Sequence, residues 1–241
     1  MANKLFALLF CALLGIVTVE CIVGGHSSLP DAAPFVVSIQ HPTHVCGGVL
    51  VKGTWVLTTA SCVNDKAVGD LKVLAGSHRL LTNMDRVAVS AKKVHASYNP
   101  TSGINNVALL QLAKDVTSTR VAAVTLNDVA VTSGLPTVFY GWGSLRYGSP
   151  ARSNELQTLF QKTLSAADCG QKIAGLPTGF ICAQIQRGQA ACSKDEGGPL
   201  IAYGTKKLIG IYDHGTQCSG NAPDVFVDVR SFSAWINANA V

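Results

Sequence analysis

The chain has 241 residues and a formal net charge of +5; 48% of its residues are hydrophobic and 14% are charged. This composition excludes a disordered chain, because it supplies enough apolar surface for a buried core. The Lys and Arg residues are scattered, with no run longer than the pairs 92–93 and 206–207. A protein that binds nucleic acid is therefore not expected.

The first segment of the chain is typical of a secretory signal. Lys4 supplies a positive start, and residues 5–19 are mostly apolar but too few to span a membrane comfortably. We interpret residues 1–21 as a signal peptide, with no membrane anchor, and expect a secreted, extracellular protein. A cut after Cys21 makes Ile22 the new N-terminus, whereas an earlier cut leaves a short pro-segment that carries Cys21.

The cysteine count agrees with export. Six of the eight cysteines follow the signal segment, and an even number in an exported chain predicts three disulfides, for which fifteen pairings exist. No Cys-x-x-Cys pair is present, and histidines such as His44 show no ligand spacing and are assigned to loops or the surface. We expect no metal and no cofactor. The six cysteines are Cys46, Cys62, Cys169, Cys182, Cys192 and Cys218.

After the signal segment, short β-branched and apolar runs alternate with turn residues, which include many of the 23 glycines. Closely spaced runs of this kind predict short strands in a sandwich or a barrel. The runs lie at 35–39, 55–58, 71–74, 87–94, 107–112, 137–140, 156–164, 180–183, 208–212 and 225–229.

Helical periodicity is confined to two places. Ser231 is suited to cap a C-terminal helix whose apolar face carries Trp235 and Ile236. A second short helix is expected to begin at Ser165, because an acidic residue follows three positions later, as in a capping box. The turn-rich stretch 126–135 is the expected boundary between two β subdomains.

Five segments occur in an order and at distances that resemble those of the trypsin/chymotrypsin-like serine proteases. One resembles the mature N-terminus of that family, and three resemble the segments that carry its catalytic residues. The segments are Ile22-Val23-Gly24-Gly25, Cys46-Gly47-Gly48 with Trp55 to Cys62, Asn106 to Leu110, Gly141-Trp142-Gly143, and Cys192 to Pro199. The resemblance covers nearly all of residues 22–241.

The resemblance implies an all-β fold of two six-stranded antiparallel β-barrels with a cleft between them and a C-terminal helix. The trypsin-like domain is expected at 22–241, with barrel subdomains at about 22–126 and 127–241. The resemblance also selects one of the fifteen pairings. It implies the disulfides Cys46–Cys62, Cys169–Cys182 and Cys192–Cys218.

All three catalytic positions implied by the resemblance are substituted. Ser61 stands at the position of the base, Asn106 at that of the carboxylate, and Glu196 at that of the nucleophilic serine. Serine cannot accept and return a proton near neutral pH as imidazole does, and a neutral amide cannot stabilise an imidazolium. We therefore expect a degenerate triad and predict that the chain is not an enzyme.

The residues before Glu196 are altered in one place and retained in another. Lys194 replaces a glycine whose N–H helps the family bind the developing oxyanion. Asp195 is retained, and the resemblance implies that it forms an ion pair with the freed amine of Ile22. No Arg or Lys directly precedes Ile22, so activation by a trypsin-like cut is not expected.

The resemblance also identifies a rewritten binding groove. Ala190 stands at the base of the primary specificity pocket, and Asp224 replaces a glycine that lines it. Asp213 and His214 replace a Ser-Trp pair on the substrate wall before Gly215. These residues form either a polar groove with its own specificity or a set of local salt bridges. His214 is not expected to act as a base, because its wall faces the substrate main chain.

The leading functional prediction is a secreted, catalytically inactive serine protease homologue that acts by binding. Its partner is expected to be another protein, such as a cascade component, a host protein or a hydrolase, which it regulates, decoys or inhibits as a monomer. The alternative is a serine-type endopeptidase or hydrolase with residual activity, or activity repurposed around Glu196 and Asp213. A third reading is a glycan- or lipid-binding secretory module.

Overall fold

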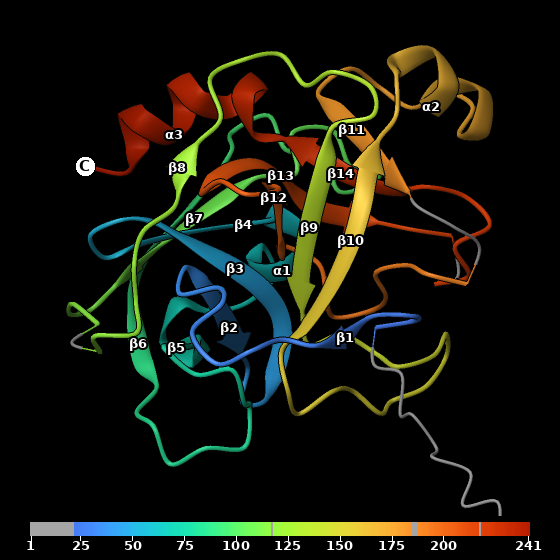
Figure 1. Ribbon diagram of the computed structural model, residues 1–241. Helices are drawn as coiled ribbons and strands as arrows, with labels where there is room; N and C mark the ends of the chain where they lie inside the picture. The colour runs from blue at the N-terminus through green and yellow to red at the C-terminus, as the bar shows by residue number, and fades with distance from the viewer. Residues whose placement is uncertain (1–21, 117, 185–187, 217) are drawn as a thin grey trace, which may run out of the picture.

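The computed structural model describes residues 22–116, 118–184, 188–216 and 218–241. The expected signal peptide at residues 1–21 lies outside the described residues. Two β-barrels lie side by side, with few helices, as Figure 1 shows. The predicted fold class, two six-stranded antiparallel barrels with a C-terminal helix, is confirmed.

The first barrel closes in the strand order β2-β3-β4-β7-β6-β5. Its interior is an apolar cluster that includes Val37, Leu71 and Leu110, all of which are fully buried. Between the strands lie the short helix α1 (Ala60–Val63) and the 3-10 turn η1 (Val68–Asp70). The strands are β2 (Val36–Gln40), β3 (His44–Lys52), β4 (Trp55–Thr58), β5 (Lys72–Ala75), β6 (Val87–Val94) and β7 (Ala108–Leu112).

The second barrel closes because β10 pairs with both β9 and β11, in the order β10-β11-β14-β13-β12-β9. Two short strands extend its sheet: β1 (His26–Ser27) pairs with β10, and β8 (Thr125–Leu126) runs parallel to β13. The barrel strands are β9 (Pro136–Gly141), β10 (Gln157–Thr163), β11 (Phe180–Gln184), β12 (Pro199–Ala202), β13 (Lys207–His214) and β14 (Asp224–Asp228). The proposed boundary at 126/127 stays a prediction.

Strand β3 was not predicted from the sequence, because its two glycines weaken the pattern of a strand. A Cβ atom on Gly47 would lie 2.8 Å from the Cα atom of Gly198, beside β12 of the other barrel. The two barrels approach closely here, and only a residue without a side chain fits. The requirement comes from tertiary contact, whereas local sequence shows two glycines that weaken a strand pattern.

Both helices predicted from the sequence are present, but the predicted cap of one of them is wrong. Ser165 caps α2 (Ala166–Lys172) by accepting a hydrogen bond from the N–H of Asp168 at 3.0 Å. The C-terminal helix α3 (Ser233–Asn239) follows a 3-10 turn, η2 (Val229–Phe232). The cap of that turn is Asp228, which accepts from the Arg230 N–H, so the expected cap at Ser231 is wrong. The Ser231 hydroxyl instead donates to Asp228 Oδ2 at 3.0 Å.

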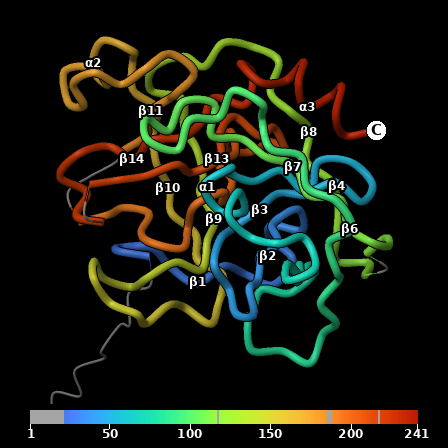
Figure 2. Tube along the Cα trace, turned by 180° about the vertical axis from the view of Figure 1, so that it is seen from behind, coloured from blue at the N-terminus to red at the C-terminus, as the bar shows by residue number. Residues whose placement is uncertain are grey.

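The C-terminal helix follows the second barrel in sequence but its end lies against the first (Figure 2). The indole N–H of Trp55 donates to the main-chain oxygen of Val241 at 3.1 Å, and the Lys93 ammonium donates to that of Asn239 at 2.9 Å. The chain therefore ties its own C-terminus across both barrels.

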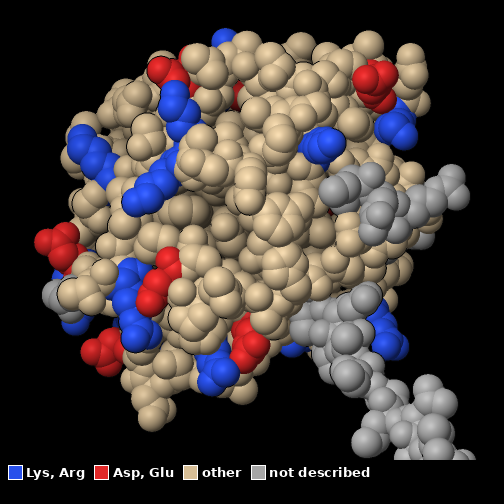
Figure 3. Space-filling model, viewed as in Figure 1, with Lys and Arg blue, Asp and Glu red and all other residues tan. Residues whose placement is uncertain are grey.

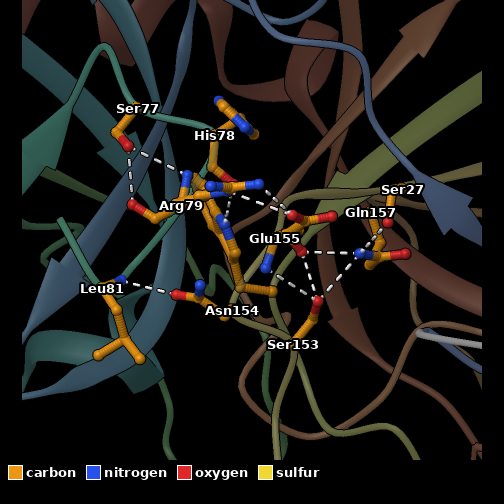
Figure 4. A network of polar contacts seen from close by, with 10 residues as sticks. Ser27, Ser77, His78, Arg79, Leu81, Ser153, Asn154, Glu155 and Gln157 are labelled. Atoms are coloured by element: carbon orange, nitrogen blue, oxygen red, sulfur yellow. Dashed lines mark hydrogen bonds and ion pairs between the residues drawn. The ribbon is translucent and has the colours of Figure 1, made fainter. Parts of the chain in front are cut away.

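A polar network joins the barrels at another point (Figure 4). The Arg79 guanidinium lies 2.8 Å from the carboxylate of Glu155, and the Leu81 N–H donates to the Asn154 side chain at 2.7 Å. Residues 78 and 156 add a main-chain hydrogen bond of 2.6 Å. The loop after β5 is thus clasped to the segment before β10, which fixes one side of the interface between the barrels.

The described residues contain three disulfides, Cys46–Cys62, Cys169–Cys182 and Cys192–Cys218, which are the pairs that the resemblance implied. Basic and acidic side chains are interspersed on the face seen in Figure 3, in keeping with the scattered charges of the sequence. Within the described part of the chain, no helix has the length and apolar character needed to cross a membrane.

Candidate functional site

A cavity of about 500 Å³ opens where elements of both barrels meet. Four of the residues singled out in the sequence line it: Ser61, Asn106, Glu196 and Asp213. Ser61 lies on α1, Asn106 directly precedes the Val107 that leads into β7, Glu196 precedes β12, and Asp213 lies on β13. The fold therefore brings the three substituted catalytic positions together with one residue of the predicted groove.

Ser61 and Asn106 hold one another. The Ser61 N–H donates to Asn106 Oδ1 at 2.8 Å, and Asn106 Nδ2 donates to Ser61 Oγ at 3.1 Å. The Ser61 hydroxyl in turn donates to Thr59 Oγ1 at 3.2 Å. Ser61 is exposed, and its hydroxyl donates to Thr59 and accepts from Asn106.

Asp213 links Asn106 to His214. Asn106 Nδ2 donates to Asp213 Oδ1 at 2.5 Å, and His214 Nδ1 lies 2.5 Å from Asp213 Oδ2. The Asp213 side chain is 7% exposed and that of His214 is 55% exposed. The hydrogen bond to the Asp213 carboxylate raises the pKa of His214, because it stabilises the imidazolium. A buried carboxylate thus orients an exposed imidazole beside the cavity.

Glu196 is held by its own turn. The Lys194 N–H donates to Glu196 Oε2 at 2.7 Å. Burial raises the pKa of Glu196, against the opposing effect of nearby main-chain N–H groups. Lys194 has φ of +74°, a left-handed conformation that a side chain disfavours. Lys194 therefore holds a backbone conformation that glycine adopts more readily.

Asp195 points away from the cavity and is fully buried. Its carboxylate accepts from the Gly143 N–H at 2.7 Å and from the Cys192 N–H at 2.9 Å. Burial raises the pKa of Asp195 to about 8. The Ile22 side chain is also fully buried. Since Ile22 follows Cys21 in the full chain, its nitrogen is a peptide nitrogen, and the expected ion pair stays a prediction about the cleaved form.

The rest of the predicted groove forms a second cluster. Asp224 is 2% exposed, and its Oδ2 accepts from Gln161 Nε2 at 2.6 Å and from the Ala191 N–H at 2.9 Å. Its Oδ1 lies 2.8 Å from where a Cβ atom on Gly215 would stand, and burial raises the pKa of Asp224 to about 7. Ala190 is buried, and its N–H donates to the Val23 oxygen at 3.0 Å. The cavity of about 500 Å³ is not lined by Ala190, Gly215 or Asp224.

Sequence reasoning misplaced His44. The residue was assigned to a loop or the surface, but it opens strand β3 and is 2% exposed. Its Nδ1 accepts from the Ser38 hydroxyl at 2.9 Å, and its Nε2 donates to the Lys194 oxygen at 3.0 Å. Burial lowers the pKa of His44 to about 4, so the ring is neutral. The signal was its position two residues before the buried Cys46, on the same side of the strand.

Two further lining residues carry functional groups that the sequence did not single out. Tyr98 and Lys66 lie at the cavity on loops of the first barrel. Lys66 pairs with Asp65 at 2.7 Å, so its charge is partly matched. The described residues contain no group of three His, Cys, Asp or Glu side chains placed to hold a metal ion.

The sequence and the fold of this chain are similar to those of known proteins. A family model described as Trypsin matches residues 22–236. Chymotrypsin-2 of Vespa crabro is 35% identical over 90% of this chain and 99% of its own length. Trypsin delta of Drosophila melanogaster is 30% identical over 91% of this chain and 88% of its own. Among solved structures, neuropsin, a serine protease expressed in the limbic system of mouse brain, superposes with a TM-score of 0.83 at 26% identity, covering 90% of this chain and 99% of neuropsin.

These comparisons correct one prediction and confirm another. The relatives are named as a chymotrypsin and as trypsins, which are enzymes, and this contradicts the prediction that the chain is not an enzyme. The three substituted positions remain as the sequence has them. The predicted family is confirmed: this chain belongs to the trypsin-like serine protease family.

Proposed function

We propose that this chain is a hydrolase that binds an extended polypeptide in the cavity and acts on it through His214, Asp213 and Glu196. The observation that carries the proposal is the hydrogen-bonded chain from Asn106 through Asp213 to His214, beside a cavity that Glu196 also lines. Membership of a protease family supplies the class of substrate.

In the proposed reaction, water attacks the scissile bond in place of the serine nucleophile that the family uses. The covalent mechanism needs an imidazole to deprotonate a serine hydroxyl, and positions 61 and 196 supply neither partner. Direct attack by water needs only a base and an acid near the scissile bond, each of which contributes about 10²–10⁴-fold in rate.

His214 is suited to be the base. Its Nδ1 proton is directed at Asp213 Oδ2, so that Nε2 is the free acceptor of the neutral ring. Asp213 stabilises the imidazolium that forms when His214 takes a proton from water. From the sequence, His214 was not expected to act as a base, and the contact with Asp213 is what favours that role here.

Glu196 is suited to be the acid. Burial raises its pKa and favours the protonated carboxyl group, whose proton would go to the leaving amine nitrogen. The two groups have different surroundings: Glu196 is buried, while the Asp213 carboxyl group contacts the imidazole of His214. Such a contrast between neighbouring titratable groups favours a division of acid and base roles.

The test is an incubation of the purified chain with a broad peptide library. Cleavage by the natural chain that falls at least about 10²-fold in both His214→Ala and Glu196→Gln supports the proposal. A quadruple variant with Ser61→His, Asn106→Asp, Lys194→Gly and Glu196→Ser shows whether the scaffold accepts peptides. Silence of the natural chain beside an active quadruple variant would overturn the proposal.

A second candidate function is capture of another protein by the same face of the molecule. The observation that favours it is the contact between Glu196 and the Lys194 N–H, which ties up a donor that substrate would need. In this reading the chain is a secreted monomer that regulates, decoys or inhibits its partner. Loss of partner capture in His214→Ala, with capture retained in the surface variant Asp128→Ala, supports it.

A further inference from the structure

The loop that follows α1 brings a positive charge to the cavity between the barrels. Lys66 lines this cavity together with Ser61, Asn106, Glu196 and Asp213. Among the described residues that line it, Lys66 is the only Lys or Arg. Its side chain is 20% exposed, so most of it is shielded from solvent. A ligand in the cavity therefore meets one cationic side chain, on the wall that the first barrel supplies.

The main chain of this loop is held by a second lysine. The Lys92 ammonium donates to the main-chain oxygens of Val63 at 2.7 Å, Asn64 at 3.1 Å and Lys66 at 2.7 Å. These contacts use all three N–H donors of the Lys92 ammonium. None of them involves the Lys66 side chain, so the loop is expected to keep its backbone conformation when that side chain is replaced.

Lys66 has a partner that a ligand can displace. Its ammonium lies 2.7 Å from Asp65 Oδ1, and the hydrogen bond from Lys66 holds the pKa of Asp65 below its usual range. The Asp65 side chain is 73% exposed. Solvent screens an ion pair with a partner this exposed, so the pair contributes little to stability. Replacing Asp65 by the carboxylate of a ligand therefore costs little.

The two carboxyl groups at the cavity oppose such a ligand only weakly. Asp213 accepts from Asn106 Nδ2 and lies against the His214 imidazole, so its charge has partners. Burial raises the pKa of Glu196, which favours its neutral form. The charge of Lys66 is therefore the one that best distinguishes acidic from neutral ligands.

We propose that Lys66 selects peptides that carry an Asp or Glu side chain, whose carboxylate takes the place of Asp65 on the Lys66 ammonium. The inference rests on the proposed function, because it names the class of polypeptide that the same cavity binds. It makes Lys66 a specificity-determining residue and Asp65 a competitor that the chain itself supplies.

The experiment measures which peptides the immobilised full chain retains. A library of short acetylated and amidated peptides, each with one Glu, is mixed with an equal library in which Gln replaces that Glu, and mass spectrometry counts the bound peptides. The natural chain is expected to retain the Glu peptides about two- to fivefold better, which is the range that one partly screened charge pair supplies. In 1 M salt this preference should fall towards one.

Two variants of the ion pair should change the preference in opposite directions. Lys66→Met keeps the length of the side chain and removes its charge, so the preference for Glu should fall to one. Asp65→Asn removes the competitor and should raise the preference by about twofold. The matched controls, Lys207→Met and Asp128→Asn, change the same charges in an ion pair of 2.8 Å whose members do not line the cavity. Both controls should leave the preference unchanged.

Four results would overturn the inference. One is a preference in Lys66→Met that equals that of the natural chain, and another is an equal loss in Lys207→Met, which would assign the preference to net charge. The others are an unchanged preference in Asp65→Asn and a natural chain that retains no peptide.

The same samples separate this inference from the proposed hydrolysis. Retention is measured after a short incubation, and cleavage of the library is measured after a long one. Cleavage without a preference for Glu would contradict the role of Lys66 alone. A preference for Glu that depends on Lys66, without any cleavage, would support that role and contradict the proposed hydrolysis.

Discussion

The imidazole of His44 lies 3.0 Å through Nε2 from the main-chain oxygen of Lys194, and joins a strand of the first barrel to a turn of the second. The opposite ring nitrogen accepts from Ser38 at 2.9 Å. A neutral ring satisfies both contacts at once, because one nitrogen donates and the other accepts. The turn that carries Glu196 is therefore held by a residue far from it in sequence.

His44→Ala is expected to destabilise the chain by about 2–4 kcal/mol, since it leaves a buried serine and a buried carbonyl without partners and opens a cavity. Urea unfolding of the purified chain measures the change. The matched control is His26→Ala, which removes an exposed imidazole from β1. A loss for His44→Ala no larger than that for His26→Ala would contradict the role given to the ring.

Asp224 predicts a dependence of stability on pH. Burial raises its pKa to about 7, well above the usual range of an aspartate, so the folded chain holds this proton more tightly than the unfolded chain. The stabilisation is complete below the unfolded pKa and is lost as pH rises through the folded one, at about 1.4 kcal/mol per pH unit. Unfolding measured from pH 4 to pH 7 should therefore show a falling stability, to which Asp195 also contributes, and Asp224→Asn should reduce the slope by about 1.4 kcal/mol per pH unit.

The control for that slope is Asp128→Asn, which alters an exposed carboxylate paired with Lys207. Its stability profile between pH 5 and pH 7 should parallel that of the natural chain. A profile for Asp224→Asn that also parallels the natural chain would mean that the buried carboxyl is ionised throughout.

Removal of residues 1–21 is expected to stabilise the chain if it leaves Ile22 as the N-terminus. Asp195 is fully buried with a pKa raised to about 8, and a free amine at Ile22 would supply the missing opposite charge. Acetylation of that amine should cost about 3–5 kcal/mol at pH 7, as for one partner of a buried pair. N-terminal sequencing of the secreted protein, followed by unfolding with and without acetylation, measures both. A start upstream of Ile22, or no effect of acetylation, contradicts the prediction.

The clasp between Arg79 and Glu155 is expected to contribute little. The two side chains are 55% and 38% exposed, so solvent screens their attraction, although Arg79 holds the pKa of Glu155 below its usual range. Arg79→Ala should cost less than about 1 kcal/mol, and less still in 1 M salt. Salt-dependent unfolding tests this, and a larger, salt-insensitive loss would assign the clasp a structural role that its exposure does not indicate.

Local sequence predicted what depends on local pattern. The β-branched runs gave ten strands, and the spacing from Ser165 gave the start of α2. Strand β3 was not predicted, because its Gly47 is required by the close approach of the other barrel, at residues about 150 positions later in the chain. Strand β12, only four residues long and headed by Pro199, lacks a readable pattern.

Some features of the candidate site could likewise be predicted from the sequence, and others could not. The meeting of Ser61, Asn106 and Glu196 follows from the family resemblance, and the cavity contains all three. The hydrogen bond from Asn106 to Asp213 and the burial of His44 depend on the packing of two barrels, which no short motif encodes. The prediction from the substituted triad that the chain is not an enzyme is contradicted by relatives that are named as a chymotrypsin and as trypsins.

The most direct test of the proposed hydrolysis is turnover of a broad peptide library by the purified natural chain, beside His214→Ala and the quadruple variant with the restored triad. The account predicts slow cleavage by the natural chain, reduced by at least about 10²-fold in His214→Ala, with an acidic limb of the pH profile, on which activity rises as His214 loses its proton, that reflects the raised pKa of His214. Cleavage by the quadruple variant alone, with the natural chain at background, would contradict it.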